Sequence, residues 1–217
     1  MTTGKQNISA IIRNYLVSRP HVRECLRRGL INYSALAREI CNDRGLEQFD
    51  AVLKACRREQ DRIQNRAPLE APIAALLSRA RLRVKTQIVV AIVAKEDSFT
   101  RFARLQEEIR SQEGDFHLIE GEKAVTIITN DGFVGLIRNT LKGAIKKIST
   151  SLTLVSLLFD KRLETTSGVV AHVYGLLAER GVNVLEEMSC WTELLMVIEE
   201  RDLASTLECL KFGKEER

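Results

Sequence analysis

The sequence is poor in several features that mark particular classes of protein. Aromatic residues make up only 5% of the 217 residues, so the cores expected from a 45% hydrophobic fraction are aliphatic. No apolar run approaches the length that spans a bilayer, and the start MTTGKQN has none of the features of a signal peptide. The five cysteines form no CxxC pair. This pattern argues against a disulfide or zinc framework and predicts reduced thiols in a cytoplasmic protein without a membrane partner.

Catalytic signatures are also missing. There is no GxxxxGK phosphate loop, no GxGxxG after a strand and no HExxH. The three histidines (His21, His117, His172) fall in different predicted elements, and none neighbours a plausible nucleophile in sequence. Glu186 and Glu187 are adjacent on a predicted strand and would point to opposite faces, so they cannot act together as acid and base. We therefore expect no enzyme, no catalytic residue, no metal and no cofactor.

The net charge of +4 conceals an asymmetry along the chain. Residues 1–83 hold 16 Lys/Arg and 8 Asp/Glu (16 − 8 = +8), whereas residues 84–217 hold 17 and 21 (17 − 21 = −4). Such a split predicts two parts with different partners, and a basic part favours a polyanion such as nucleic acid. Solvation of short helices explains the same charges without a ligand.

Residues 1–63 show only helical periodicity and are predicted to form a helical domain. Apolar residues at helical spacing mark a helix that Pro20 ends, a short helix that Gly29 ends, a third helix NYSALAREI and a fourth helix LEQFDAVLKACRREQDRI. Between the last two lies the predicted loop CNDRG. Residues 64–83 are expected to be a linker, because QNRAPLEAP holds two of the three prolines, with a short helix IAALLSRARL.

After residue 84 the order of predicted elements repeats. QIVVAIVA begins the series strand, helix, strand, strand, helix, with a further strand from about residue 144, and SLTLVSLLF (151–159) begins the same series again. Two tandem ferredoxin-like βαββαβ units are therefore expected, at 84–148 and 149–217. The predicted fold class is α+β, and the sheet face without helices should meet another module or subunit.

The segment TTSG in the second repeat lies between a predicted strand and a predicted helix. Gly168 lets backbone N–H groups approach a ligand, and a helix N-terminus favours an anion such as a carboxylate. Asn183 opens the next strand and is expected beside that loop in a βαβ arrangement, where its amide could meet an amino acid's ammonium and carboxylate. A tight turn at Gly168 and a satisfied strand edge at Asn183 are the structural alternatives.

The residues ETTSGVV, LLAERGVNV and LLMVI within 164–198 resemble an ACT domain, most closely the tandem ACT pair of aspartokinases. The whole layout is similar to archaeal proteins described as predicted regulators of amino-acid metabolism. The resemblance implies a homodimer that binds a small effector, typically an amino acid, at ACT interfaces. Carried over by position, the effector would contact Ser167, Gly168, Val169, Asn183 and Val184.

Two departures from the family pattern matter. The family often has proline before the loop glycine, where this chain has Ser167. The first repeat has KEDSF (95–99) after its strand and no glycine, so the resemblance implies a structural role for that copy.

The helical part is similar to a helix-turn-helix, with the helix containing FDAVLKACRRE as the recognition helix. Lys54, Arg57, Arg58 and Arg62 could then contact phosphates or guanine edges of DNA. The first hypothesis is a DNA-binding, amino-acid-sensing transcriptional regulator. The alternative is a regulatory subunit whose helical bundle docks on a metabolic enzyme.

Overall fold

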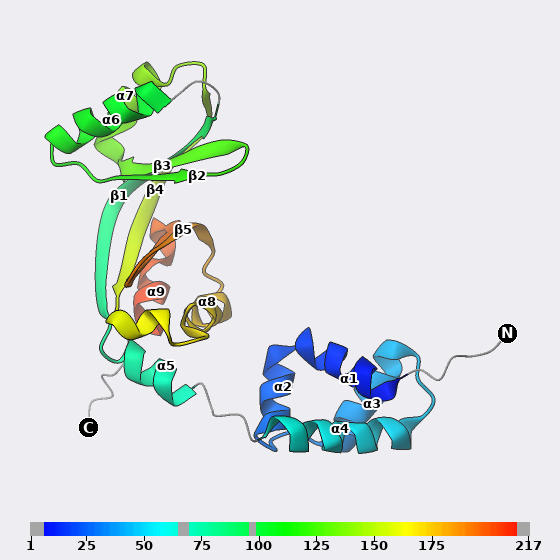
Figure 1. Ribbon diagram of the computed structural model, residues 1–217. Helices are drawn as coiled ribbons and strands as arrows, with labels where there is room; N and C mark the ends of the chain where they lie inside the picture. Colours follow the sequence, from blue (N-terminus) through cyan, green and yellow to red (C-terminus); the bar gives the residue numbers. More distant parts are fainter. Residues whose placement is uncertain (1–6, 65–69, 96–98, 212–217) are drawn as a thin grey trace. The chain divides into compact units, whose positions relative to one another are not determined.

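A computed structural model describes residues 7–64, 70–95 and 99–211 of the chain (Figure 1). The chain divides into two compact units, residues 1–68 and 69–217. Among the described helices, none is long and apolar enough to cross a membrane. Most of the expected linker QNRAPLEAP lies outside the described residues, as does the centre of the KEDSF loop.

The first unit consists of four helices around one aliphatic core. They are α1 (Ile8–Val17), α2 (Pro20–Arg27), α3 (Tyr33–Arg44) and α4 (Phe49–Ile63). Helix α4 contacts the other three. The core contains Ile12, Tyr15, Leu16, Leu26, Leu36, Ile40, Val52, Cys56 and Ile63. An N-terminal helical region is therefore present, as predicted.

The predicted loop CNDRG is wrong, because its first four residues form the last turn of α3. Asn32 starts this helix by accepting hydrogen bonds from Ser34 N and Ala35 N. Gly45 ends it in the left-handed region at φ 61°, and Leu46 N donates to Cys41 O at 2.9 Å. The α3–α4 connection is thus only residues 45–48, closer to the tight turn of a helix-turn-helix than the sequence indicates.

The second unit holds an antiparallel six-stranded sheet in the order β2-β3-β1-β4-β6-β5. The strands are β1 (Arg81–Ala94), β2 (Phe116–Glu120), β3 (Ala124–Asn130), β4 (Ile145–Leu158), β5 (Val184–Cys190) and β6 (Glu193–Glu199). The helices are α5 (Glu70–Leu77), α6 (Phe99–Ser111), α7 (Val134–Thr140), α8 (Val169–Glu179) and α9 (Leu203–Cys209). Three short 3-10 turns are η1 (Asp131–Phe133), η2 (Lys161–Glu164) and η3 (Glu200–Asp202).

Strands β1 and β4 are longer than predicted and run through both halves of the sheet. The two strands expected near residue 144 and at 151–159 are one strand, β4, with Ser151 at φ 58°. The helix expected at 73–82 ends at Leu77, and β1 already begins at Arg81. Consequently the strand beside Leu154–Leu158 is Arg81–Lys85, from the range expected to be linker.

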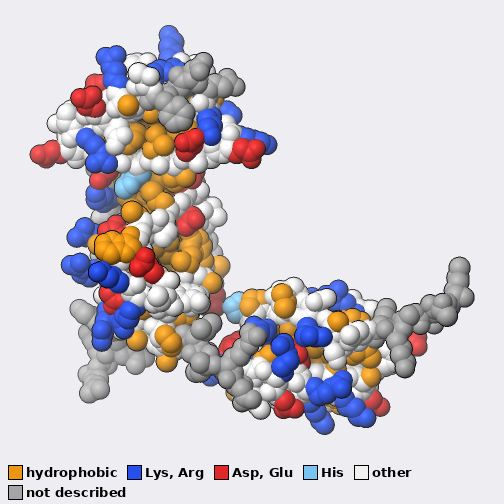
Figure 2. All heavy atoms as spheres, in the orientation of Figure 1, with side chains coloured by type: hydrophobic (Ala, Val, Ile, Leu, Met, Phe, Trp, Pro, Cys, Tyr) orange, Lys and Arg blue, Asp and Glu red, His pale blue; other side chains and the backbone are white. Residues whose placement is uncertain are grey.

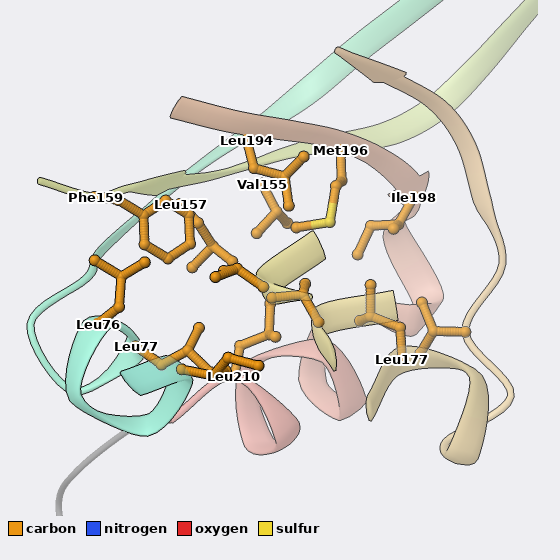
Figure 3. Packing of buried hydrophobic residues seen from close by; sticks show 14 residues of the cluster. Leu76, Leu77, Val155, Leu157, Phe159, Leu177, Leu194, Met196, Ile198 and Leu210 are labelled. Atoms are coloured by element: carbon orange, nitrogen blue, oxygen red, sulfur yellow. The ribbon is translucent and has the colours of Figure 1, made fainter. Parts of the chain in front are cut away.

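Helices cover the outer faces of the two half-sheets. Helices α6 and α7 lie over a core that contains Val89, Phe102 and Ile127. Helices α8 and α9 lie over a core that contains Val155, Leu177 and Met196, and α5 adds Leu76 and Leu77 (Figure 3).

The inner faces of the two half-sheets share one further core. It combines Ile88, Val90 and Ile128 of one half with Leu152, Leu154, Leu195 and Val197 of the other. The faces that no helix covers therefore meet each other inside this unit.

Candidate functional site

The loop between β4 and α8 is held by its own hydrogen bonds. Asp160 accepts from Arg162 N at 3.0 Å and pairs with the Arg162 guanidinium at 2.6 Å. These bonds lower the pKa of Asp160 to about 2. The Thr166 hydroxyl donates to Arg162 O at 2.7 Å. These hydrogen bonds hold the loop in a defined turn just before α8.

Gly168 begins α8 in a conformation that suits glycine. Its φ is 88°, in the left-handed region, and it has no side chain with which to cap the helix. The first N–H groups of a helix have no intrahelical acceptor. The start of α8 therefore offers backbone donors to a ligand.

A hollow of about 310 Å³ lies beside this helix start. The loop side contributes Glu164, Thr166, Gly168, Val169 and Val170, among others. The facing side is the end of the β5–β6 hairpin, which contributes Ser189, Trp191 and Leu194. The hollow combines backbone donors, one carboxylate and apolar walls.

Trp191, the chain's one tryptophan, lines this hollow with an unusual exposure and backbone conformation. Its side chain is 63% exposed, and its backbone is in the left-handed region at φ 51°. The Lys161 ammonium lies 5.7 Å from the centre of its ring. An exposed aromatic ring held on a strained backbone costs free energy, and such strain clusters at functional sites.

The structure brings together only part of the predicted effector site. Gly168 and Val169 line the hollow, and Ser167 is exposed in the same loop. Asn183 is exposed and Val184 half-buried, both at the opposite end of β5. Val184 pairs with Ile198, whereas Ser189 pairs with Leu194, and five strand residues correspond to about 17 Å.

The expected proximity of Asn183 to the loop is therefore wrong within one chain. Strands β4 and β5 are both antiparallel to β6, so they run parallel to each other. The loop that follows the end of β4 must then lie near the end of β5, not near its start. Trp191 and Ser189 were missed for the same reason, although a single tryptophan in a predicted hairpin was a possible signal.

One carboxylate of β5, that of Glu187, has a structural partner. The Tyr174 hydroxyl of α8 donates to Glu187 Oε2 at 3.1 Å. Burial, with the neighbouring Glu187 carboxylate, raises the pKa of Tyr174. Burial also raises the pKa of Glu186. Helix α8 is thus tied to the edge strand.

Figure 2 shows Lys and Arg side chains on the visible face of the helical unit, among hydrophobic and acidic ones. The predicted DNA-binding residues lie together on α4 but differ in their surroundings. Arg62 Nε donates to Glu59 Oε2 at 2.9 Å, and the Glu59 carboxylate is nearly buried. The Arg57 guanidinium lies 5.9 Å from the centre of the Tyr33 ring. Lys54, Arg57 and Arg58 line a hollow of about 460 Å³ against α1.

Within the described ranges, no group of three or more His, Cys, Asp or Glu side chains could hold a metal ion. The cysteines are free thiols, and burial raises the pKa of Cys56 to about 11. His117 is half-buried, and burial lowers its pKa.

These features define an α+β unit with a curled antiparallel sheet and helices on its outer faces. A solved structure of Clostridium acetobutylicum aspartate kinase, described as an allosteric enzyme, shares this fold. Its TM-score is 0.52 at 15% identity, over 61% of this chain and 34% of that chain. The present chain thus matches about a third of that enzyme's length.

Two other solved structures are similar at lower scores. The regulatory subunit of aspartate kinase from Thermus thermophilus has TM-score 0.48 and 12% identity, over 59% of this chain and 92% of that chain. E. coli aspartokinase III, solved with lysine and aspartate, has TM-score 0.45 and 15% identity, over 60% of this chain and 31% of that chain. No protein-family model and no curated protein matches the sequence.

Proposed function

We propose that the second unit is a pair of ACT-like domains and that the protein is an amino-acid-sensing regulator. One domain consists of residues 88–150. The other consists of residues 152–211, with Arg81–Lys85 as its fourth strand. Each set has the strand order expected of a βαββαβ unit, with its first and third strands in the middle. The domains are interlocked rather than strictly tandem, because β1 and β4 pass through both.

The observation that carries effector binding is the hollow at the start of α8. Its N–H groups suit a carboxylate, and Glu164 suits an ammonium group. Val170 and Trp191 offer apolar surface to a side chain. An α-amino acid presents this combination of groups, and a hollow with mostly apolar walls and few polar groups is typical of small-ligand sites.

The remaining predicted contacts, Asn183 and Val184, are too far from this hollow within one chain. In the proposed homodimer a second copy supplies them, so that the effector lies between the Gly168 loop of one copy and Asn183 of the other. A two-fold interface would then hold two such sites.

Thermal-shift screening with the twenty amino acids tests effector binding. A ligand at one hundred times its dissociation constant adds about 2.7 kcal/mol to the free energy of unfolding. The shift should disappear in Asn183→Ala and in Trp191→Gly, and should persist in Asn42→Ala, an exposed asparagine of α3. No shift with any amino acid contradicts the proposal.

Mixing the two binding-deficient variants tests the shared site. After random subunit exchange, half of the dimers are mixed, and one of the two sites in each mixed dimer carries neither substitution. About a quarter of the wild-type effector sites should therefore return, as measured by calorimetric titration. No recovery means that both residues act within one chain.

The helical unit carries the output in this proposal. It would act on DNA through Lys54, Arg57, Arg58 and Arg62, or dock on a metabolic enzyme. Gel-shift titration with genomic fragments tests the first, since phosphate contacts make binding strongly dependent on salt. The pairing of Arg62 with Glu59 favours the second, because it removes one of the four cations.

A further inference from the structure

Helices α1 and α4 form a groove whose floor and rim differ in chemistry. One hollow, of about 460 Å³, is lined by Ile8, Ala51, Lys54, Arg57 and Arg58. A second, of about 230 Å³, is lined by Ser9, Arg13, Ala55, Arg58, Glu59 and Arg62. Arg58 belongs to both, so the two hollows follow one another along the same helix pair.

The floor of this α1–α4 groove is apolar. Ile8 is half-buried on α1, and the facing residues of α4 are Ala51 and Ala55. Ala51 is half-buried and Ala55 is buried at the bottom of the second hollow, and these small side chains leave the space open. Such a floor accepts apolar side chains from a ligand.

The rim of the groove is basic and largely uncompensated. Lys54, Arg57 and Arg58 are exposed, and no ion pair is formed by any of them among the residues that the structure describes. Arg13 adds a fourth cation from α1, where its Nε donates to Ser9 O at 3.2 Å. The carboxylate in the groove, Glu59, is already paired with Arg62.

Duplex DNA fits this arrangement poorly. A recognition helix enters the major groove with its N-terminal residues at the base edges. The first turn of α4 instead carries the exposed acid Asp50, and the exposed Glu47 lies in the connection just before the helix. The cations begin only at Lys54 and surround a hollow. A hollow receives a ligand, whereas a recognition helix must project into the DNA groove.

We propose that the α1–α4 groove is a docking site for an acidic amphipathic helix of a partner protein. Apolar side chains at positions i, i+3 or i+4 and i+7 of that helix occupy the Ile8–Ala51–Ala55 floor. Its flanking Asp and Glu side chains pair with Lys54, Arg57, Arg58 and Arg13. This proposal deepens the docking form of the proposed function, but the groove lies wholly in the helical unit and needs no effector.

The test selects ligands for the full-length protein from a phage library of random peptides about 16 residues long. We expect enrichment of peptides that combine helical apolar spacing with Asp and Glu. A fluorescently labelled copy of the most enriched peptide then gives dissociation constants by anisotropy. Lys54→Glu and Arg58→Glu should each weaken binding about tenfold, and Ala51→Met should weaken it by filling the floor.

Arg38→Glu is the matched control, because Arg38 is exposed on α3 and the substitution makes the same change in net charge. It should leave the affinity unchanged. A peptide with Lys in place of Glu should lose affinity for the wild type and regain it for Arg58→Glu. Far-ultraviolet circular dichroism confirms that each variant is folded.

Three outcomes overturn the proposal. One is the absence of enriched acidic peptides, and another is equal weakening by Arg38→Glu. The third is displacement of the peptide by duplex DNA, if the DNA binds more tightly than the peptide and its affinity falls steeply with salt. That result would assign the groove to nucleic acid. None of these outcomes bears on the amino-acid thermal shift, so this proposal and effector binding fail separately.

Discussion

Single residues with left-handed backbone conformations decide where several elements of this molecule begin and end. Gly45 ends α3, Gly168 begins α8, and Trp191 turns the β5–β6 hairpin. Glycine at the first two positions was visible in the sequence. The left-handed backbone of Trp191 was not predictable, because no preference of tryptophan indicates a positive φ.

Gly45 offers a clean measure of this backbone effect. A Cβ at position 45 would meet nothing within 4 Å, so a substitution there changes backbone strain and not packing. We expect Gly45→Val to lower the free energy of unfolding of the helical unit by about 1–2 kcal/mol. Gly45→Asn should cost less, because asparagine tolerates this region better. Urea unfolding measures both, and equal costs would contradict a backbone origin.

The lowered pKa of Asp160 predicts that stability depends on pH with a sign opposite to that expected of a buried carboxyl. Its hydrogen bonds to Arg162 lower the pKa to about 2 from 3.8, so folding favours the charged form. The stabilisation is therefore complete above about pH 4 and is lost as the pH falls toward 2. The difference in melting temperature between wild type and Asp160→Asn should be constant from pH 7 to 5 and shrink below pH 4. A carboxyl titration by NMR with a midpoint near 4 would rule this out.

At the scale of elements, the spacing of apolar residues predicted most strands and helices but not where one element joins the next. The buried segments 88–94 and 152–158 were predicted because both are rich in apolar residues over the length of a strand. The extensions 81–86 and 145–150 were not predicted as parts of the same strands. They are largely exposed, and Gln87 and Ser151 have positive φ without the glycine that usually signals such a bend.

The shared strands make a specific prediction about fragments. The proposed second ACT-like domain needs Arg81–Lys85 beside β4, where Val84 pairs with Val155 and Leu82 with Leu157. A fragment of residues 149–217 therefore lacks one strand and exposes an apolar edge. It should show no cooperative thermal unfolding by circular dichroism, whereas residues 70–217 should unfold cooperatively. A cooperative transition in the shorter fragment would favour two strictly tandem domains.

At the scale of the whole molecule, the sequence indicated two parts with different partners through their opposite charges. The relative positions of the predicted effector-binding residues could not be predicted in the same way. They depend on the direction of each strand in the sheet, which places the start of β5 far from the start of α8. Nothing local in the residues around Asn183 encodes that direction, because it follows from the antiparallel pairing of both β4 and β5 with β6.

The proposed regulator must couple its two proposed binding events, and thermodynamics fixes the form of that coupling. If an amino acid changes the affinity of the α1–α4 groove for its peptide by some factor, the peptide must change the affinity for the amino acid by the same factor. Typical allosteric coupling of about 1–3 kcal/mol corresponds to roughly 5- to 150-fold. Anisotropy titrations of the peptide with and without saturating amino acid give one factor, and calorimetry of the amino acid with and without peptide gives the other.

We expect equal factors in wild type and a factor of one in Asn183→Ala, which should bind peptide normally but not the effector. Arg38→Glu serves again as the control that should leave both factors unchanged. Binding of both ligands with a factor of one in wild type would mean that the groove does not carry the output of the sensor. Effector binding would then have to act through another surface of the chain, because a ligand shifts an equilibrium only through its different affinities for the two states.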